Sequence, residues 1–146
     1  MTGFVIRCAQ SGDFEPAFAL LIQLWFDKAL NRERQRSVFN TMIESAGYEL
    51  LCAELDRAVI GFASLSIQHN FWQGGRILYI TTMIVDERHR KQGIGTALIR
   101  EIDRIAAMRG CGRVELESSF HRRAAHDFYE KMGFEKRAFF FSKVVQ

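Results

Sequence analysis

The sequence predicts an α/β (α+β) domain with a mixed, mostly antiparallel central sheet and helices on both faces of that sheet. Two observations support this fold class. Apolar runs with strand character alternate with amphipathic helical patterns along the chain. A short polar connection at residues 56–58 separates two strand-like runs, which is typical of an antiparallel hairpin. The length of 146 residues suits one domain, so we expect a single core and a single site over residues 1–146.

Apolar runs bounded by polar or turn-forming residues predict the strands. They are expected at residues 4–7, 48–55, 59–67, 76–85, 114–117 and 139–145. The last run contains Phe139, Phe140 and Phe141, and a flat aromatic strand near the C-terminus makes a homodimer plausible.

Apolar residues that recur at helical spacing predict the helices. They are expected at residues 13–28, 34–45, 93–109 and 122–132. In the first helix, Asp13 can serve as the N-cap and Pro16 fits the first turn. The residues expected to form its buried stripe are Phe18, Leu21, Ile22, Trp25 and Phe26. The buried face expected of the third helix consists of Leu98, Ile99, Ile102, Ile105 and Ala106.

The composition argues against several classes of protein. Hydrophobic residues make up 48% and charged residues 25% of the chain, which are values typical of globular proteins. The net charge of +3 is too small to indicate a nucleic-acid partner, although it suits an anionic ligand. No segment reaches the roughly 18 uninterrupted apolar residues of a membrane span, and the N-terminus lacks a secretory signal pattern. We therefore expect a soluble, cytoplasmic protein without a membrane partner.

Cysteine and histidine lack the spacing of metal or disulfide sites. The 3 cysteines and 4 histidines are scattered along the chain, so we expect reduced thiols and no metal. Cys111 lies between Gly110 and Gly112 with no histidine or acid arranged to activate it, so covalent catalysis is not expected.

The most informative segment is the basic, glycine-containing stretch between the strand expected at residues 76–85 and the helix expected at residues 93–109. A helix start presents free backbone N–H groups and the positive end of the helix dipole. Gly93 and Gly95 remove side chains that would block the approach of phosphate oxygens. Arg88, Arg90 and Lys91 add positive charge. This segment is therefore predicted to bind a phosphate-containing anion.

Two motifs indicate a family. A dinucleotide fingerprint is excluded because Leu98 occupies the position of its third glycine, and the chain contains no P-loop motif. Residues 90–95, Arg-Lys-Gln-Gly-Ile-Gly, instead resemble motif A of the GCN5-related N-acetyltransferases (GNAT), R/Q-x-x-G-x-G/A. Residues 124–134, with a Phe-Tyr pair and a final Gly-Phe, resemble motif B of the same family. The order and spacing of the motifs also match, so the resemblance implies the GNAT-type acyl-CoA N-acyltransferase fold.

The resemblance also implies acetyl-CoA as co-substrate and assigns roles to residues. The backbone of Met83, Ile84 and Val85 would line the pantetheine arm and polarise the thioester oxygen. Tyr129 would be the general acid that protonates the departing thiolate. The residues implied to hold the pyrophosphate and neighbouring parts of coenzyme A are Arg90, Lys91, Gln92, Gly93, Ile94, Gly95, Thr96 and Lys131.

The general base is left open. Many family members place a glutamate in the strand before the loop, where this chain has Thr81 and Thr82. The residues that could take the proton instead are Glu115, Glu117, His69, His121 and His126.

The predicted activity is transfer of an acetyl group to a primary amine of a small molecule by direct attack in a ternary complex. A narrower resemblance to aminoalkylphosphonate N-acetyltransferases, through residues 120–129 and 139–143, hints at an acceptor that also carries an anionic group. The side chains expected to surround the acceptor are Trp25, Phe26, His69 and Trp72.

Three other functions stay open at this point. A non-catalytic acyl-CoA sensor or interaction module would fit the missing strand carboxylate. An acetyltransferase of peptide or protein amines would use the same loop. A nucleic-acid binder is disfavoured because the basic run is short and has no interleaved aromatic residues.

Overall fold

The computed structural model describes residues 3–146, which form two compact units. The larger unit ends at Glu115 and the smaller one begins at Leu116. The strands are β1 (Phe4–Cys8), β2 (Tyr48–Leu55), β3 (Ala58–Asn70), β4 (Gly75–Val85) and β5 (Cys111–Leu116). The helices are α1 (Phe14–Leu24), α2 (Arg32–Ile43), α3 (Ile94–Met108) and α4 (Arg123–Lys131), with short 3-10 turns η1 (Ser11–Asp13) and η2 (Glu87–His89).

The strands form one sheet in the order β1-β2-β3-β4-β5 within the described residues. The pairs β1/β2, β2/β3 and β3/β4 are antiparallel, and β5 lies beside β4. Asp56 and Arg57 connect β2 to β3 with φ values of 50° and 67°, the left-handed pair that a two-residue hairpin turn requires. The predicted mixed, mostly antiparallel sheet is therefore confirmed.

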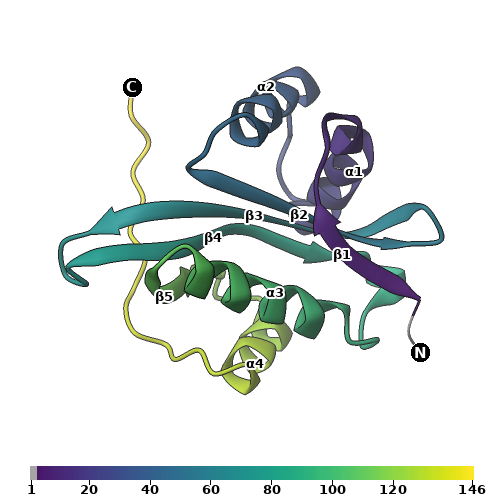
Figure 1. Ribbon diagram of the computed structural model, residues 1–146. Helices are drawn as coiled ribbons and strands as arrows, with labels where there is room; N and C mark the ends of the chain where they lie inside the picture. Colours follow the sequence, from purple (N-terminus) through teal and green to yellow (C-terminus); the bar gives the residue numbers. More distant parts are fainter. Residues whose placement is uncertain (1–2) are drawn as a thin grey trace. The chain divides into compact units, whose positions relative to one another are not determined.

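Helices cover both faces of the sheet in the larger unit, as Figure 1 shows. α1 and α2 lie on one face, and α3 lies on the opposite face. The predicted buried face of α3 is confirmed, since Leu98, Ile99, Ile102, Ile105 and Ala106 are all buried. Burial of a large aliphatic side chain contributes about 1.5–3 kcal/mol to the stability of the fold. This buried face therefore holds α3 on the sheet, and with it the preceding basic loop at residues 86–93, which we call the candidate loop.

The buried stripe of α1 differs from the prediction. The helix ends at Leu24 rather than near residue 28, and its buried residues are Phe14, Ala17 and Leu20. Phe26 lies beyond the helix end and is 77% exposed. Asp13 does not cap α1 with its side chain, because its carboxylate accepts hydrogen bonds from the Arg7 guanidinium and from the backbone N–H of Gln10. Of the predicted stripe, Phe18 and Leu21 are half-buried and pack against the core, whereas Ile22 is 49% exposed.

The smaller unit contains α4 and the C-terminal segment. The predicted helix over 122–132 is confirmed as α4. The predicted strand at 139–145 is wrong, because these residues form no strand and Phe139, Phe141 and Val145 are at least 74% exposed. Strand propensity produces a strand only where a partner edge completes the backbone hydrogen bonds. Each helix described between residues 3 and 146 is too short or too polar to span a lipid bilayer.

Candidate functional site

The segment from β4 to α3 has the geometry of an anion-binding turn. The 3-10 turn η2 follows β4 directly, and the chain then passes through two residues in the left-handed region before α3 begins. These residues are Lys91 with φ 61° and Gly93 with φ 85°. The N-cap residue of α3 is Gly93, which has no side chain to bond the first N–H groups of the helix, so these groups can meet a ligand.

Gly93 is required by its backbone conformation rather than by crowding. A Cβ atom built at this position would meet no other atom within 4 Å. Its φ of 85°, however, lies in a region that residues with a side chain rarely adopt. The exposed position of Gly93 leaves the backbone accessible from solvent.

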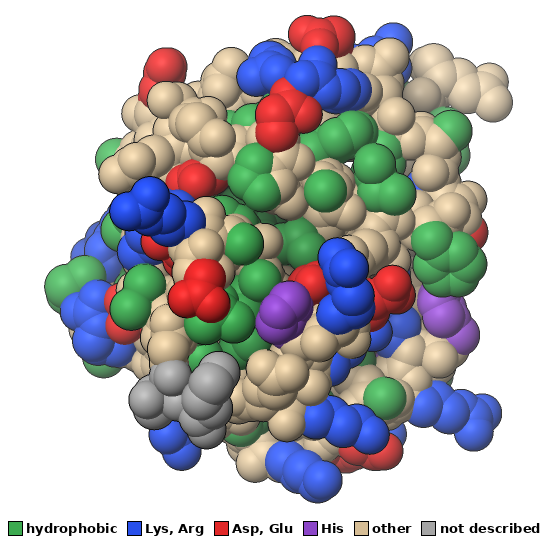
Figure 2. All heavy atoms as spheres, turned by 90° about the vertical axis from the view of Figure 1, so that its right-hand side faces the viewer, with side chains coloured by type: hydrophobic (Ala, Val, Ile, Leu, Met, Phe, Trp, Pro, Cys, Tyr) green, Lys and Arg blue, Asp and Glu red, His purple; other side chains and the backbone are tan. Residues whose placement is uncertain are grey.

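The basic side chains of the loop are mostly turned to solvent. Arg90 donates from Nε to the carbonyl oxygen of Val85 at 3.1 Å, so its guanidinium folds back over the end of β4. The side chain of Arg88 is 84% exposed, and Lys91 and Gln92 are exposed as well. Figure 2 views the molecule from the right-hand side of Figure 1, and on this face Lys and Arg side chains are interspersed with acidic and apolar ones. The loop therefore offers local positive charge without a continuous basic surface on this face.

A buried carboxylate holds the loop in place. Asp86 directly follows β4 and is 6% exposed. Its Oδ1 accepts a hydrogen bond from Gln23 Nε2 at 2.9 Å, and its Oδ2 lies 2.8 Å from His89 Nδ1. Gln23 Oε1 in turn accepts from the backbone N–H of Glu87. The hydrogen bond from Gln23, followed by that from His89, lowers the pKa of Asp86, so the carboxylate is charged at neutral pH.

A β-bulge in β4 brings two hydroxyl groups to one face of the sheet. Ser64 on β3 pairs with Thr82, whereas the next residue of β3 pairs with Ile80, so Thr81 is the extra residue of β4. Consecutive side chains of a regular strand point to opposite faces, and a bulge interrupts this alternation. Thr81 Oγ1 lies 2.5 Å from Ser64 Oγ and donates to the Ser64 carbonyl oxygen at 3.0 Å. The bulge therefore allows both Thr81 and Thr82 to line the same cavity.

That cavity opens between α1, α2 and the sheet and has a volume of about 200 Å³. Its walls include Trp25 from the α1 end, Phe39 from α2 and Phe62 from β3. Of the four side chains predicted to surround the acceptor, only Trp25 lines this cavity. Trp72 instead lies under the guanidinium of Arg113, 5.3 Å from the ring centroid. We refer to this space as the β4 cavity.

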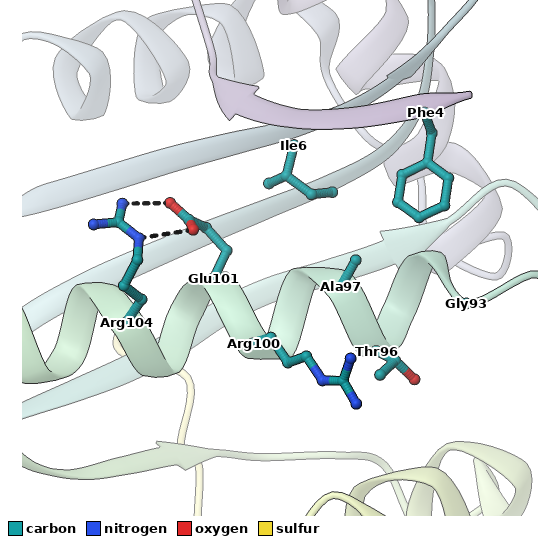
Figure 3. Close-up of a pocket in the computed structure, with 8 residues that line it drawn as sticks. All are labelled: Phe4, Ile6, Gly93, Thr96, Ala97, Arg100, Glu101 and Arg104. Carbon is teal, nitrogen blue, oxygen red and sulfur yellow. Dashed lines mark hydrogen bonds and ion pairs between the residues drawn. The ribbon is translucent and has the colours of Figure 1, made fainter. Parts of the chain in front are cut away.

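A larger, open groove of about 620 Å³ runs between β1 and α3 (Figure 3). Phe4 and Ile6 point from β1 toward α3, while Glu101 and Arg104 of α3 form an ion pair. Gly93 of the candidate loop and Thr96 of α3 stand at one end of the groove. The turn that would hold phosphate groups is therefore bordered by open space on this side.

Tyr129 belongs to the smaller unit, near the end of α4. Its ring makes edge-to-face contacts with Phe128 and Phe134, at centroid distances of 5.4 and 5.6 Å. Burial raises the pKa of Tyr129, and the positive charge of Arg122 opposes this shift. The phenol therefore keeps its proton at neutral pH. Lys131, at the last position of α4, is exposed.

None of the suggested general bases lines the β4 cavity or the β1/α3 groove. Glu115 lies 3.6 Å from Arg113, and His126 Nε2 lies 2.9 Å from the Ser119 carbonyl oxygen.

Cys111 is half-buried, and burial raises the pKa of its thiol, which disfavours a nucleophilic thiolate. Residues 3–146 contain no group of three or more His, Cys, Asp or Glu side chains that could hold a metal ion.

The sequence did not single out Gln23, Asp86 or Ser64. An aspartate directly after a buried strand and before a basic loop was a usable signal for Asp86. Gln23 and Ser64 carried no such signal, because their partners lie 63 and 17 residues away in the chain.

The fold is that of an α/β protein in which a turn with left-handed residues leads from β4 to the start of α3. Comparison with known proteins names the family. Residues 15–134 match the model of the acetyltransferase (GNAT) family, and the chain belongs to that family. Membership places it among the acyltransferases, and the predicted family resemblance is confirmed.

Individual relatives support this assignment. The chain is 38% identical to glucosamine 6-phosphate N-acetyltransferase of Trypanosoma brucei brucei over 87 residues, which cover 59% of this chain and 57% of that protein. It is 26% identical to aminoalkylphosphonate N-acetyltransferase of Salmonella typhimurium over 140 residues, covering 96% of this chain and 90% of the relative. The crystal structure of a Trypanosoma brucei acetyltransferase matches with a TM-score of 0.79 and 28% identity, covering 97% of this chain and 99% of that chain.

Proposed function

We propose that this protein transfers the acetyl group of acetyl-CoA to a primary amine of a small molecule. The observation that carries this proposal is the turn through Lys91 and Gly93 into the uncapped start of α3, within a chain of the GNAT family. A helix start of this kind binds a diphosphate through several backbone N–H groups at once. Relatives named as acetyltransferases of an amino sugar phosphate and an aminoalkylphosphonate support a small amine as acceptor.

The donor side uses mostly backbone groups. The pyrophosphate would lie against residues 92–96, with Arg90, Lys91 and Lys131 supplying positive charge nearby. Met83, Ile84 and Val85 would line the pantetheine arm with their backbone, and an N–H there would polarise the thioester oxygen. This arrangement tolerates many side chains at these positions, because the interactions come from the peptide groups.

The chemical step is a direct displacement. The neutral amine nitrogen attacks the acetyl carbonyl carbon, the C–N bond forms, and the C–S bond breaks. Tyr129 donates its phenolic proton to the departing thiolate, and a raised pKa supports this role because the phenol is protonated at neutral pH. The amine loses its proton to solvent, since no carboxylate or imidazole of residues 3–146 lines the β4 cavity.

Thiol release over a panel of amines tests the proposal. With acetyl-CoA present, at least one small primary amine should accelerate the appearance of free CoA thiol, and mass spectrometry should find the N-acetylated amine. A protein that binds acetyl-CoA but accelerates thiol release with none of the amines would be a sensor rather than an enzyme. Acetylation of peptide amines alone would instead place the acceptor in another class.

A further inference from the structure

The wall of the β4 cavity carries no charge. All of its lining side chains are neutral, and most of them are apolar or aromatic. Trp25, Phe39 and Phe62 present ring surfaces, while Gln35 is the polar residue contributed by α2. An ionised group that entered this space would lose its hydration without gaining a partner of opposite charge, which is strongly unfavourable.

Two of the hydroxyl groups that line the cavity are hydrogen-bonded to one another, so part of their hydrogen-bonding capacity is already used. Ser64 Oγ and Thr81 Oγ1 are hydrogen-bonded at 2.5 Å, and Thr81 also donates to the Ser64 carbonyl oxygen. Ser64 is 2% exposed and Thr81 is half-buried, so the Ser64 side of this pair is shielded from solvent. Such hydroxyls can accept or donate a single hydrogen bond to an amine, but they cannot neutralise a phosphate or carboxylate.

Two guanidinium groups beside the Phe14 ring are already paired. Arg36 lies 4.6 Å from the centroid of the Phe14 ring, which lines the cavity from α1. Its guanidinium is 2.7 Å from Glu15 Oε2, and Arg32 also pairs with Glu15 and with Glu33. The positive charge beside the cavity is therefore balanced by carboxylates on the same helices.

The cavity is small and lies next to the expected thioester. Its volume of about 200 Å³ falls below the roughly 300–1,000 Å³ of typical ligand pockets. Thr82 immediately precedes Met83, and one residue of a strand advances about 3.3 Å. A compact acceptor in this cavity would have its amine beside the backbone of Met83, where the proposed function places the acetyl group of the thioester.

We infer that the acceptor is a small amine with an uncharged, apolar or aromatic body, such as an arylalkylamine. The ring lies against Trp25, Phe39 and Phe62, and the neutral amine points to the hydroxyls at Thr81 and Thr82. This inference rests on the proposed function and narrows its acceptor, and it differs from the phosphate- or phosphonate-bearing acceptors of the two curated relatives.

A comparison of kcat/KM between uncharged and anionic amine acceptors tests the inference. We expect kcat/KM for phenethylamine and benzylamine to exceed that for glucosamine 6-phosphate and 2-aminoethylphosphonate by about 100-fold or more, because the charged acceptors would be desolvated without a partner. Thiol release and mass spectrometry of each product give these values. A higher kcat/KM for either charged acceptor would overturn the inference and leave the proposed function standing. Turnover of no amine at all would overturn both.

A matched pair of variants tests whether the acceptor binds in the β4 cavity. Val38 on α2 and Ile22 on α1 are both 49% exposed, but only Val38 lines the β4 cavity. Val38→Trp should fill much of the cavity and raise KM for phenethylamine by about tenfold or more, with KM for acetyl-CoA unchanged. Ile22→Trp should leave both values near wild type. Equal KM for phenethylamine in Val38→Trp and wild type would exclude this cavity as the acceptor site.

Discussion

Gln23 and Asp86 lie 63 residues apart in the chain, and the side-chain amide of Gln23 donates to the buried Asp86 carboxylate at 2.9 Å. Asp86 directly follows β4 and begins the candidate loop, while α1, which carries Gln23, forms one wall of the β4 cavity. The same carboxylate contacts His89 within η2. One buried acid therefore connects the wall of the proposed acceptor site to the loop of the proposed donor site.

Removal of this carboxylate should weaken both the loop and the fold. Asp86→Ala leaves Gln23 and His89 without their partner, which we expect to cost about 1–3 kcal/mol of stability. We also expect weaker acetyl-CoA binding, because the turn before α3 loses its anchor. Thermal unfolding and calorimetric titration measure the two effects. Glu87→Ala changes the adjacent, exposed acid and is the control, and equal behaviour of the two variants would contradict the anchoring role.

Tyr129→Phe tests the proposed proton donor. The substitution keeps the ring that packs on Phe128 and Phe134 and removes only the hydroxyl. We expect kcat to fall by about 100-fold, the usual effect of a lost general acid, with acetyl-CoA affinity nearly unchanged. Tyr48→Phe at the start of β2 is the matched control and should keep wild-type kcat. Wild-type turnover by Tyr129→Phe would remove this residue from the mechanism.

The pH dependence of kcat gives an independent test of the same residue. Burial raises the pKa of Tyr129 above the ordinary value of 10.0. A general acid acts in its protonated form, so its contribution is complete at neutral pH and is lost only as the pH rises through the raised pKa. We therefore expect no decline of kcat from this group below about pH 10. An alkaline decline near neutral pH that disappears in Tyr129→Phe would contradict this assignment.

Acid should destabilise the larger unit through two carboxylates. The hydrogen bond from Arg7 lowers the pKa of Asp13, and the hydrogen bond from Gln23 lowers that of Asp86, both from an ordinary 3.8. A lowered pKa in the folded state stabilises the protein above the unfolded-state pKa, and this stability is lost as the pH falls toward the folded-state value. We expect Tm to drop between about pH 5 and about pH 2, and to drop less in Asp13→Asn. Asp27→Asn, at an exposed position, is the control, and an equal drop in both variants would argue against the Arg7–Asp13 pair.

The sequence was most informative where local chemistry decides the structure. The amphipathic period of α3 predicted its buried face, and the two left-handed turn residues between β2 and β3 lie in the polar connection expected there. The helix start at Gly93 was also predictable, because glycine spacing and the change from strand to helix are local signals. Each of these features depends on neighbouring residues alone.

Features that depend on distant partners were not predictable. The hydrogen bonds of Asp13 with Arg7 and Gln10 replace the expected helix cap, and the choice of buried residues in α1 depends on its packing on the sheet. The bulge at Thr81 becomes visible only when β3 and β4 are paired. The aromatic C-terminal run has strand propensity but no strand in the described chain, because propensity does not supply a partner edge.

The most direct test of the central claim is calorimetric titration of acetyl-CoA into Gly93→Val and Gly12→Ala. A Cβ atom added at either glycine would have open space around it, but only Gly93 has a left-handed φ. Valine at Gly93 should distort the turn and displace N–H groups from the pyrophosphate, and loss of one such bond to a charged group, worth about 1.5–3 kcal/mol, predicts at least about tenfold weaker binding. Gly12→Ala should bind like wild type. Wild-type affinity in a folded Gly93→Val protein would contradict the claim that this turn holds the coenzyme.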